Sequence, residues 1–263
     1  MAERLPIIRL QPDCIVEWGA HLGASRDCLR RNYPKARWLG VESATGYLAA
    51  MATPASRPWW QRWQAAAPAQ AIADEAALAP GQCQLLWANM ALHGAIDPQA
   101  VMQRWHRALA VDGFLMFSTL GPGSLQGLRN LYRDQGWAAP NAPFVDMHDL
   151  GDMLIEAGFA DPVMDQETLT LTWPSGHALL DELRQLGGNV DPRRFAGLRT
   201  PRWRQRLAAL LEEGADASGR IGLEFEIVYG HAFRPAPRPR LTPETSVALD
   251  DMRAMVRAGR GRA

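Results

Sequence analysis

Two acidic residues and two glycines near the start of the chain have types and spacing that suit a nucleoside ligand. Glu17 and Gly19 follow the apolar run CIV, and Gly23 lies four residues further on. Glu42 comes 23 residues after Gly19, close to the roughly 20 that separate a glycine turn from a ribose-binding acid. A carboxylate there would accept charge-assisted hydrogen bonds from ribose hydroxyls, each worth about 1.5–3 kcal/mol. The spacing therefore predicts a nucleoside-type ligand.

The turn after Glu17 differs from turns that bind a pyrophosphate. Those turns are glycine-rich, because backbone N–H groups must approach the phosphates closely. Here His21 stands at the central position, no lysine follows, and the pattern GxxxxGK[ST] does not occur in the sequence. A cofactor without phosphates fits better. S-adenosylmethionine is the leading candidate, since its positive sulfonium suits a neighbourhood of carboxylates and strand-end carbonyls.

More polar residues follow the other apolar runs that we expect to form strands. Ligands of open α/β sheets bind at the carboxyl ends of the strands. The candidates for cofactor contact at these ends are Ser43, Asp74, Glu75, Asn89 and Met90, with Asp74 and Glu75 placed for the adenine edge. The alternative interpretation is that these residues serve only capping and solubility.

Strand and helix patterns alternate five times in the first 120 residues. Strands are expected over 14–18, 37–42, 71–75, 84–88 and 114–119, helices over 23–31, 43–51 and 98–109, and a turn at 111–113. This alternation predicts a parallel sheet covered by helices on both faces. Later segments predict a helix over 148–157, a strand over 167–173, helical structure over 175–213 and a final strand over 223–232.

The composition is that of a globular protein, with 47% hydrophobic residues and 28 basic against 28 acidic residues in a chain of 263. No apolar run approaches the 18 or so residues that a membrane span needs, and no segment resembles a signal peptide. We therefore expect a cytoplasmic protein, and a monomer. The three cysteines lack zinc-site spacing, so no metal site is predicted. Of the basic residues only Lys35 is lysine; the arginines reflect coding bias or a surface for an acidic partner, and no motif indicates nucleic-acid binding.

Longer segments resemble a known family. In this order, VEWGAHLG, GVES, WANMALH and LAVDGFLMFSTLGPGSLQGLR resemble class I S-adenosylmethionine-dependent methyltransferases. FVDMHDLGDMLIEAGF, LRQLGGNV and FEIVYGHAF narrow the resemblance to malonyl-acyl-carrier-protein O-methyltransferases of the BioC type, which act in biotin synthesis. The likeness runs from about Ile15 to Pro235.

The resemblance implies a seven-stranded, mostly parallel Rossmann-like methyltransferase sheet of the α/β class, with the last strand antiparallel. It implies a methyltransferase core over 1–174 and 218–235 and a small helical lid insertion over 175–217, followed by a proline- and arginine-rich tail over 236–263. The substrate would be a malonyl thioester on an acidic acyl carrier protein, methylated on its free carboxylate. An acidic carrier would give the arginine-rich insertion a purpose, because complementary charge steers association.

The resemblance also suggests residues for the reaction. His93, Tyr229 and His231 are candidates near the transferred methyl group. Tyr229 and His231 are two apart on a strand and therefore share a face. Candidates for substrate contact are Asp146, His148, Arg193, Arg194 and Arg199. An arginine is expected to orient the substrate carboxylate, and the sequence does not choose among these three. For Asp146 and His148 the alternative is capping of the helix that follows, for His93 it is capping of a loop, and for Tyr229 and His231 it is core packing.

The sequence departs from the family at His21, where the family's loop has a glycine. A side chain there would crowd the methionine end of the cofactor or force the loop outward. The first strand also begins at residue 14, where relatives carry a few dozen residues before it, so Met1 is expected to be internal to a longer natural chain. These departures keep two alternatives open: a degenerate, non-catalytic assembly or binding factor with the same fold, as among mitochondrial complex I assembly factors, and a methyltransferase of another substrate.

Overall fold

The computed structural model describes residues 1–22, 25–42 and 71–237. Gly23, Ser43 and the helix expected over 43–51 lie outside the described residues, as does the tail beyond residue 237. Among the helices that are described, none is long and apolar enough to cross a membrane.

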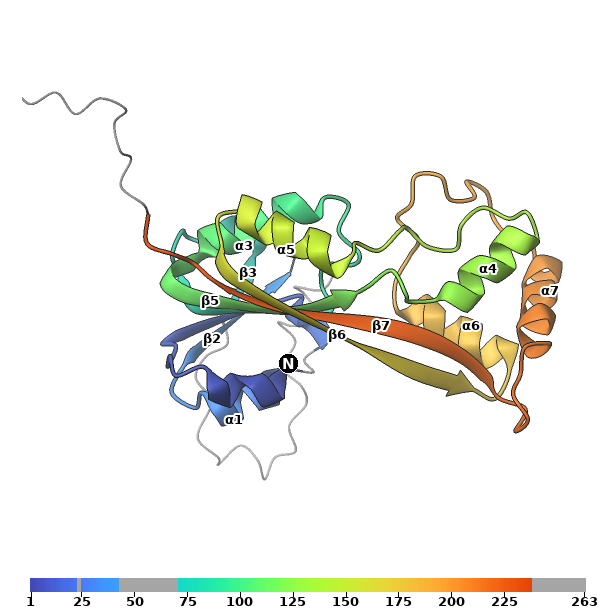
Figure 1. Ribbon diagram of the computed structural model, residues 1–263, viewed down its shortest axis with the longest axis horizontal. Coiled ribbons are helices and arrows are strands. Elements are labelled where there is room, and N and C mark those ends of the chain that lie inside the picture. The colour runs from blue at the N-terminus through green and yellow to red at the C-terminus, as the bar shows by residue number, and fades with distance from the viewer. Residues whose placement is uncertain (23–24, 43–70, 238–263) are drawn as a thin grey trace, which may run out of the picture.

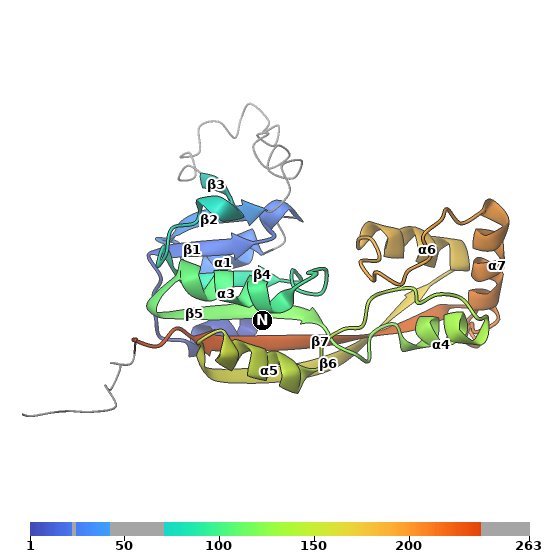
Figure 2. The same ribbon diagram turned by 90° about the horizontal axis from the view of Figure 1, so that it is seen from above.

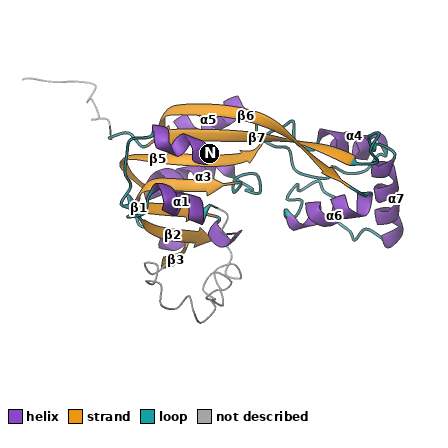
Figure 3. Cartoon of the chain, turned by 90° about the horizontal axis from the view of Figure 1, so that it is seen from below, coloured by secondary structure: helices purple, strands orange, loops and turns teal. Residues whose placement is uncertain are grey.

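A seven-stranded mixed sheet forms the centre of the molecule, in the order β3-β2-β1-β4-β5-β7-β6 (Figures 1 and 3). The strands are β1 (Cys14–Trp18), β2 (Arg37–Glu42), β3 (Ala71–Asp74), β4 (Cys83–Asn89), β5 (Leu109–Leu120), β6 (Ala160–Trp173) and β7 (Ile221–Phe233). Strands β1 to β5 pair in parallel, whereas β7 runs antiparallel to both of its neighbours. The predicted α/β class and mostly parallel sheet with an antiparallel final strand are confirmed.

Helices cover both faces of this sheet, as the alternation predicts. The short 3₁₀ helix η1 (Ala2–Ile7) and α1 (Arg26–Asn32) pack on one face through Leu5 and Leu29. On the other face lie α3 (Pro98–Ala108), which packs against β4 and β5, and α5 (Met147–Glu156), which packs against β6 and β7 (Figure 1). Strands with both faces covered are near-continuous apolar runs, and all five residues of β1 are buried, with Glu17 as the one acid among them.

The start of β5 corrects the expected turn at 111–113. This segment lies inside β5, where Asp112 has φ 62° and the register with β4 shifts. The backbone groups of Asp112 and Gly113 pair with those of Arg234, at 2.8 Å in each direction. The turn-like residues therefore form an irregularity within a strand, because long-range pairing satisfies their backbone groups.

Three helices form a second packed unit beyond the main part of the sheet. It contains α6 (Gly176–Gln185), α7 (Pro201–Glu212) and α4 (Gln126–Asp134), a helix that was not predicted. These helices share an apolar cluster with Trp173 of β6 and Phe225 of β7. The long strands β6 and β7 connect this helical unit to the rest of the molecule (Figure 2). The helical unit thus takes in α4, which lies outside residues 175–217.

The carboxyl ends of β1, β4 and β5 point toward the helical unit (Figure 2). Open α/β sheets bind ligands at this edge. The fold therefore places the predicted cofactor residues on the side of the core that the helical unit faces.

Candidate functional site

Glu42 ends β2 and is held by the turn that follows β1. One carboxylate oxygen, Oε1, accepts a hydrogen bond from the backbone N–H of His21 at 2.6 Å and lies 2.8 Å from the imidazole Nδ1 of the same residue. The Glu42 side chain is only 5% exposed. Gly19 starts the turn with φ 72°, a conformation that L side chains rarely adopt. The turn thus brings His21 directly onto the predicted ribose-binding carboxylate.

Glu17 is the second acid of this edge and lies inside the sheet. Its Oε2 accepts a hydrogen bond from the indole N–H of Trp38 at 2.8 Å, and the hydroxyl of Ser25 also bonds to it. Burial raises the pKa of Glu17, while the bonds from Trp38 and Ser25 oppose that rise. Trp38 belongs to β2 and Ser25 directly precedes α1, so Glu17 connects the end of β1 to these two elements.

The ends of β4 and β5 are joined by a small polar network. The hydroxyl of Ser118 donates to Asn89 Oδ1 at 2.9 Å, and the backbone N–H of Met90 reaches both the carbonyl and the hydroxyl oxygen of Ser118 at 3.0 Å. Met90 has φ 53°, which is uncommon for a residue other than glycine and is often found at functional sites. Ser118 was not among the candidates, although its place at a strand end is the kind of signal that selected Asn89.

His93 follows β4 in the loop toward α3. Its Nδ1 is buried and has no hydrogen-bond partner among the described residues. Burial lowers the pKa of His93, so the imidazole is neutral at pH 7. A neutral ring with an unsatisfied nitrogen at the carboxyl edge of the sheet is suited to contact a ligand.

Tyr229 and His231 of β7 share one face of the sheet, as predicted. Tyr229 lies opposite Ser118 in the register with β5, and its hydroxyl bonds to Glu167 of β6. The guanidinium of Arg4 lies 5.5 Å from the centre of the Tyr229 ring. Burial, first, and the Glu167 carboxylate raise the pKa of Tyr229 to about 12. Burial and Arg4 lower the pKa of His231. The N-terminal helix η1 therefore reaches this face, a contact that no local pattern predicts.

The remaining acidic candidates are divided between two places. Asp74 pairs with Glu42 in the register of β3 with β2. Glu75 follows it and forms an ion pair with Arg104 at 3.6 Å. Both line up with the edge that carries Glu42, and Glu75 borders a pocket of about 340 Å³ beside Trp18. Asp146 caps α5 by accepting the backbone N–H of His148 at 2.8 Å, which is the capping geometry that the sequence left as one alternative.

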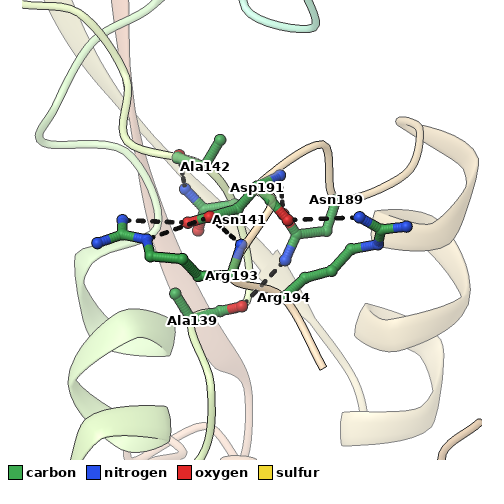
Figure 4. A network of polar contacts seen from close by, with 7 residues as sticks. All are labelled: Ala139, Asn141, Ala142, Asn189, Asp191, Arg193 and Arg194. Atoms are coloured by element: carbon green, nitrogen blue, oxygen red, sulfur yellow. Dashed lines mark hydrogen bonds and ion pairs between the residues drawn. The ribbon is translucent and has the colours of Figure 1, made fainter. Parts of the chain in front are cut away.

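The three candidate arginines lie in or next to the segment 186–200 between α6 and α7. Asp191, only 1% exposed, accepts the backbone N–H of Arg193 at 2.7 Å and its guanidinium at 3.3 Å (Figure 4). These bonds lower the pKa of Asp191. Arg199 stacks on Phe195 and Trp203, with distances of 3.8 Å and 4.6 Å to the ring centres. Arg194 donates to the carbonyl of Asp191 at 3.5 Å.

Comparison with known proteins now identifies the family. The chain is 39% identical over 246 residues to the malonyl-[acyl-carrier protein] O-methyltransferase of Laribacter hongkongensis, covering 91% of this chain and 82% of that one. The protein of the same name from Gallionella capsiferriformans is 37% identical over 244 residues, with 90% and 82% covered. The chain belongs to the malonyl-[acyl-carrier protein] O-methyltransferase family. No protein-family model matches it.

Solved structures agree with this membership at the level of the fold. The YcgJ protein of Bacillus subtilis has a TM-score of 0.60 at 9% identity, covering 89% of this chain and 97% of that one. A phosphoethanolamine N-methyltransferase of Haemonchus contortus, solved with S-adenosyl-L-methionine, has a TM-score of 0.50 at 12% identity, covering 87% and 50%. This member of the malonyl-[acyl-carrier protein] O-methyltransferase family thus has the α/β methyltransferase fold.

Within this member of the family, the structure divides the candidates among four places. Glu17, Gly19, Glu42 and Asp74 lie at the ends of β1 to β3, whereas Asn89 ends β4 and Met90 and His93 follow it. Tyr229 and His231 lie beside β5, and the arginines lie in the helical unit. Arg4, which sequence reasoning missed, touches the candidate Tyr229. Ser118, a strand-end residue to which the sequence assigned no role, bonds to the candidate Asn89.

Proposed function

We propose that the protein transfers the methyl group of S-adenosylmethionine to the free carboxylate of a malonyl thioester carried on an acyl carrier protein. The observation that carries this proposal is the family membership, at 39% identity over 91% of the chain. The buried carboxylate at the end of β2 and the left-handed glycine at the end of β1 are the features that a ribose and a cofactor turn require.

The residues proposed for each role are those that the sequence and the resemblance to the family select. The cofactor residues are Glu17, Gly19, Gly23, Glu42, Ser43, Asp74, Glu75, Asn89 and Met90; the residues beside the reacting atoms are His93, Tyr229 and His231; those toward the substrate are Asp146, His148, Arg193, Arg194 and Arg199. Glu42 would hold the ribose hydroxyls. Residues 175–217 would act as a lid over the carboxyl edge of the core.

The chemistry needs little acid or base assistance. When bound, S-adenosylmethionine would supply an electrophilic methyl group to a carboxylate oxygen, and S-adenosylhomocysteine would leave with the electron pair of the broken carbon–sulfur bond. Because the acceptor carboxylate is already ionised near pH 7, the protein must chiefly orient it and exclude water. The low pKa of His93 keeps its ring neutral, so it can contact the substrate without adding a charge.

The segment 186–200 offers a surface for an acidic carrier. Arg193 and Arg194 are exposed there, next to Phe195 at 48% and Leu198 at 97% exposure. Exposed apolar side chains among cations suit a partner that combines acidic residues with apolar contacts. We place the docking of the acyl carrier protein on this segment.

Two measurements test the proposal. Calorimetric titration with S-adenosylmethionine should show binding by the wild type, weakened at least about tenfold in Glu42→Ala through loss of charge-assisted bonds to ribose. Methyl transfer from the labelled cofactor should then reach malonyl-carrier but not acetyl-carrier protein, since the latter has no free carboxylate. Growth of a biotin auxotroph that lacks its own methyltransferase provides the matching test in cells.

The contact between His21 and Glu42 favours one rival, a non-catalytic member of the family. Absence of cofactor binding at millimolar concentration, for the wild type and for His21→Gly, would support that rival and overturn the enzyme. Binding without transfer to malonyl-carrier protein would indicate a methyltransferase of another substrate.

A further inference from the structure

A second pocket, of about 220 Å³, lies between α4 and the segments 139–144 and 191–193. Its walls include Pro122, Arg129, Asn141, Asp191 and Arg193, so a carboxylate that is paired with Arg193 also lines it. Pro122 follows Ser118 by four residues on the chain that leaves β5, and Ser118 bonds to Asn89. The pocket therefore lies on the carboxyl side of the sheet, beyond the group of candidates at the end of β4.

Two guanidinium groups border this pocket. Nη2 of Arg129 donates to the carbonyl of Pro122 and to Gln126, which fixes the orientation of the side chain. Within the described part of the chain, Nε and Nη1 of Arg129 have no hydrogen-bond acceptor. Burial lowers the pKa of Arg129, although the Glu226 carboxylate opposes this. A partly buried cation with unused donors favours an anionic ligand.

Arg193 supplies the second guanidinium from the opposite wall. Its Nε and Nη2 each lie 3.3 Å from an oxygen of Asp191. Asn189 braces Asp191 from its other side, because Asn189 Oδ1 accepts the Asp191 backbone N–H at 2.9 Å and its Nδ2 donates to the carbonyl of Ala139 at 2.9 Å (Figure 4). These bonds join the two loops that form the pocket and hold Arg193 at its rim.

Asn141 lies on the same wall as Ala139 and has an unsatisfied acceptor. Its Nδ2 donates to the carbonyl of Ala142 at 2.7 Å, whereas its Oδ1 is buried and receives no hydrogen bond from any described residue. Buried polar atoms in proteins are nearly always paired. A ligand that enters this pocket should therefore bring an N–H group as well as an anion.

We propose that this pocket binds the prosthetic arm of the carrier protein, with the arm's phosphate between Arg129 and Arg193 and an amide N–H of the arm on Asn141. This inference rests on the proposed function, and it adds the recognition of the arm to that of the acyl group. The arm carries a phosphate at its protein end and amides along its length, which matches the two requirements of the pocket. The rim arginine lies in the segment on which the carrier docks.

The test compares three malonyl thioesters as methyl acceptors: malonyl-carrier protein, malonyl-phosphopantetheine and malonyl-pantetheine, which lacks the phosphate. The wild type should use the phosphorylated small thioester with a kcat/KM at least about tenfold above that of the other, through charge-assisted bonds to the phosphate. Arg129→Gln should remove this advantage through a higher KM for malonyl-phosphopantetheine and leave the kcat/KM for malonyl-pantetheine unchanged. Arg193→Gln, at a residue that is also assigned to the substrate, should reduce the ratio between the two kcat/KM values. Asn141→Ala should raise the KM for both small thioesters alike, because both carry the amide.

Arg133→Gln is the matched control, since Arg133 lies on the same helix as Arg129 and its side chain is 72% exposed. It should retain the wild-type preference. Calorimetric binding of phosphopantetheine against pantetheine provides a readout without turnover, and thermal unfolding checks that each variant folds.

The outcomes separate this inference from the proposed function. If Arg129→Gln lowers the kcat/KM for both small thioesters equally, the guanidinium binds the substrate carboxylate or supports the fold. The assignment to the phosphate is then wrong. If the wild type prefers neither thioester and binds phosphopantetheine no better than pantetheine, the inference is overturned although methyl transfer stands. If the wild type methylates no malonyl thioester, the proposed function fails, and calorimetry alone decides whether the pocket binds the arm.

Discussion

The imidazole of His21 is hydrogen-bonded to the carboxylate of Glu42, with Nδ1 2.8 Å from Oε1. The backbone N–H of His21 reaches the same oxygen at 2.6 Å. One residue of the turn after β1 therefore makes two contacts with the group that we assign to the ribose. The histidine that replaces a glycine does not point away from the site but occupies an acceptor within it.

Removal of the imidazole should strengthen cofactor binding. In His21→Ala and His21→Gly, Oε1 of Glu42 keeps the backbone N–H but loses the imidazole, so one acceptor position becomes available for a ribose hydroxyl. A hydrogen bond in proteins has a net value of about 0.5–1.5 kcal/mol. We expect S-adenosylmethionine to bind roughly two- to tenfold more tightly, measured by calorimetry. Weaker binding in both variants would show that the imidazole itself contacts the cofactor. A gain in His21→Gly alone would assign the effect to the backbone of the turn.

Glu17→Gln should change how stability depends on pH. Because burial raises the pKa of Glu17 in the folded state, ionisation costs more in the folded than in the unfolded chain. Below the unfolded value of 4.5 the acid is protonated in both states, and the cost grows as the pH rises through the folded pKa. Relative to the wild type, the variant should gain stability from pH 4.5 to pH 8 in urea unfolding. If the difference in unfolding free energy between variant and wild type does not vary with pH, the raised pKa of Glu17 is contradicted.

His93→Gln should reduce the fall in the free energy of unfolding between pH 7.5 and pH 5.5. Burial lowers the pKa of His93 below its ordinary 6.5, so the unfolded chain takes up a proton before the folded chain does. The wild type therefore loses stability as the pH falls from 6.5 through the folded pKa, and the variant lacks this contribution. Unfolding in urea at pH 7.5 and 5.5 measures it. His106 and His231 also have lowered pKa values but remain in both proteins, so their effect cancels.

Gly176→Ala should disturb the helical unit. A Cβ at this position would lie 2.4 Å from the carbonyl oxygen and 2.7 Å from the Cα of Ala208 in α7. Overpacking of this kind typically costs about 1–3 kcal/mol. If residues 175–217 act as a lid, the KM for malonyl-carrier protein should rise while the affinity for S-adenosylmethionine is unchanged.

Gly214→Ala is the control for that variant, because it lies outside the segment 186–200 and an added Cβ there meets only the carbonyl oxygen of Leu211, at an ordinary 3.5 Å. We expect unfolding free energy and KM close to those of the wild type. Equal effects of the two substitutions would mean that the contact between α6 and α7 does not matter for the substrate.

The local patterns of the sequence predicted most of the fold. The buried run of β1 and the helix that starts at Pro98 have signals within a few residues, and their bounds agree closely with the structure. The prediction failed where distant pairing decides the conformation. Residues 111–113 have turn chemistry but join β5 because the backbone of Arg234 pairs with them. α4 was missed, and its Leu128 is buried in a cluster that includes residues of the distant elements α6, α7, β6 and β7.

For the site, the sequence by itself determined which residues stand at strand ends, because chain order and strand period fix them. It determined Glu17, Glu42 and Asn89 as a set, and it singled out His21 as the departure. Only the tertiary structure decided that His21 turns onto Glu42, that Arg4 reaches Tyr229, and that Arg129 and Asn141 share a pocket. These contacts join segments far apart in the chain, and the packing of whole elements, rather than any local preference, sets the distances between them.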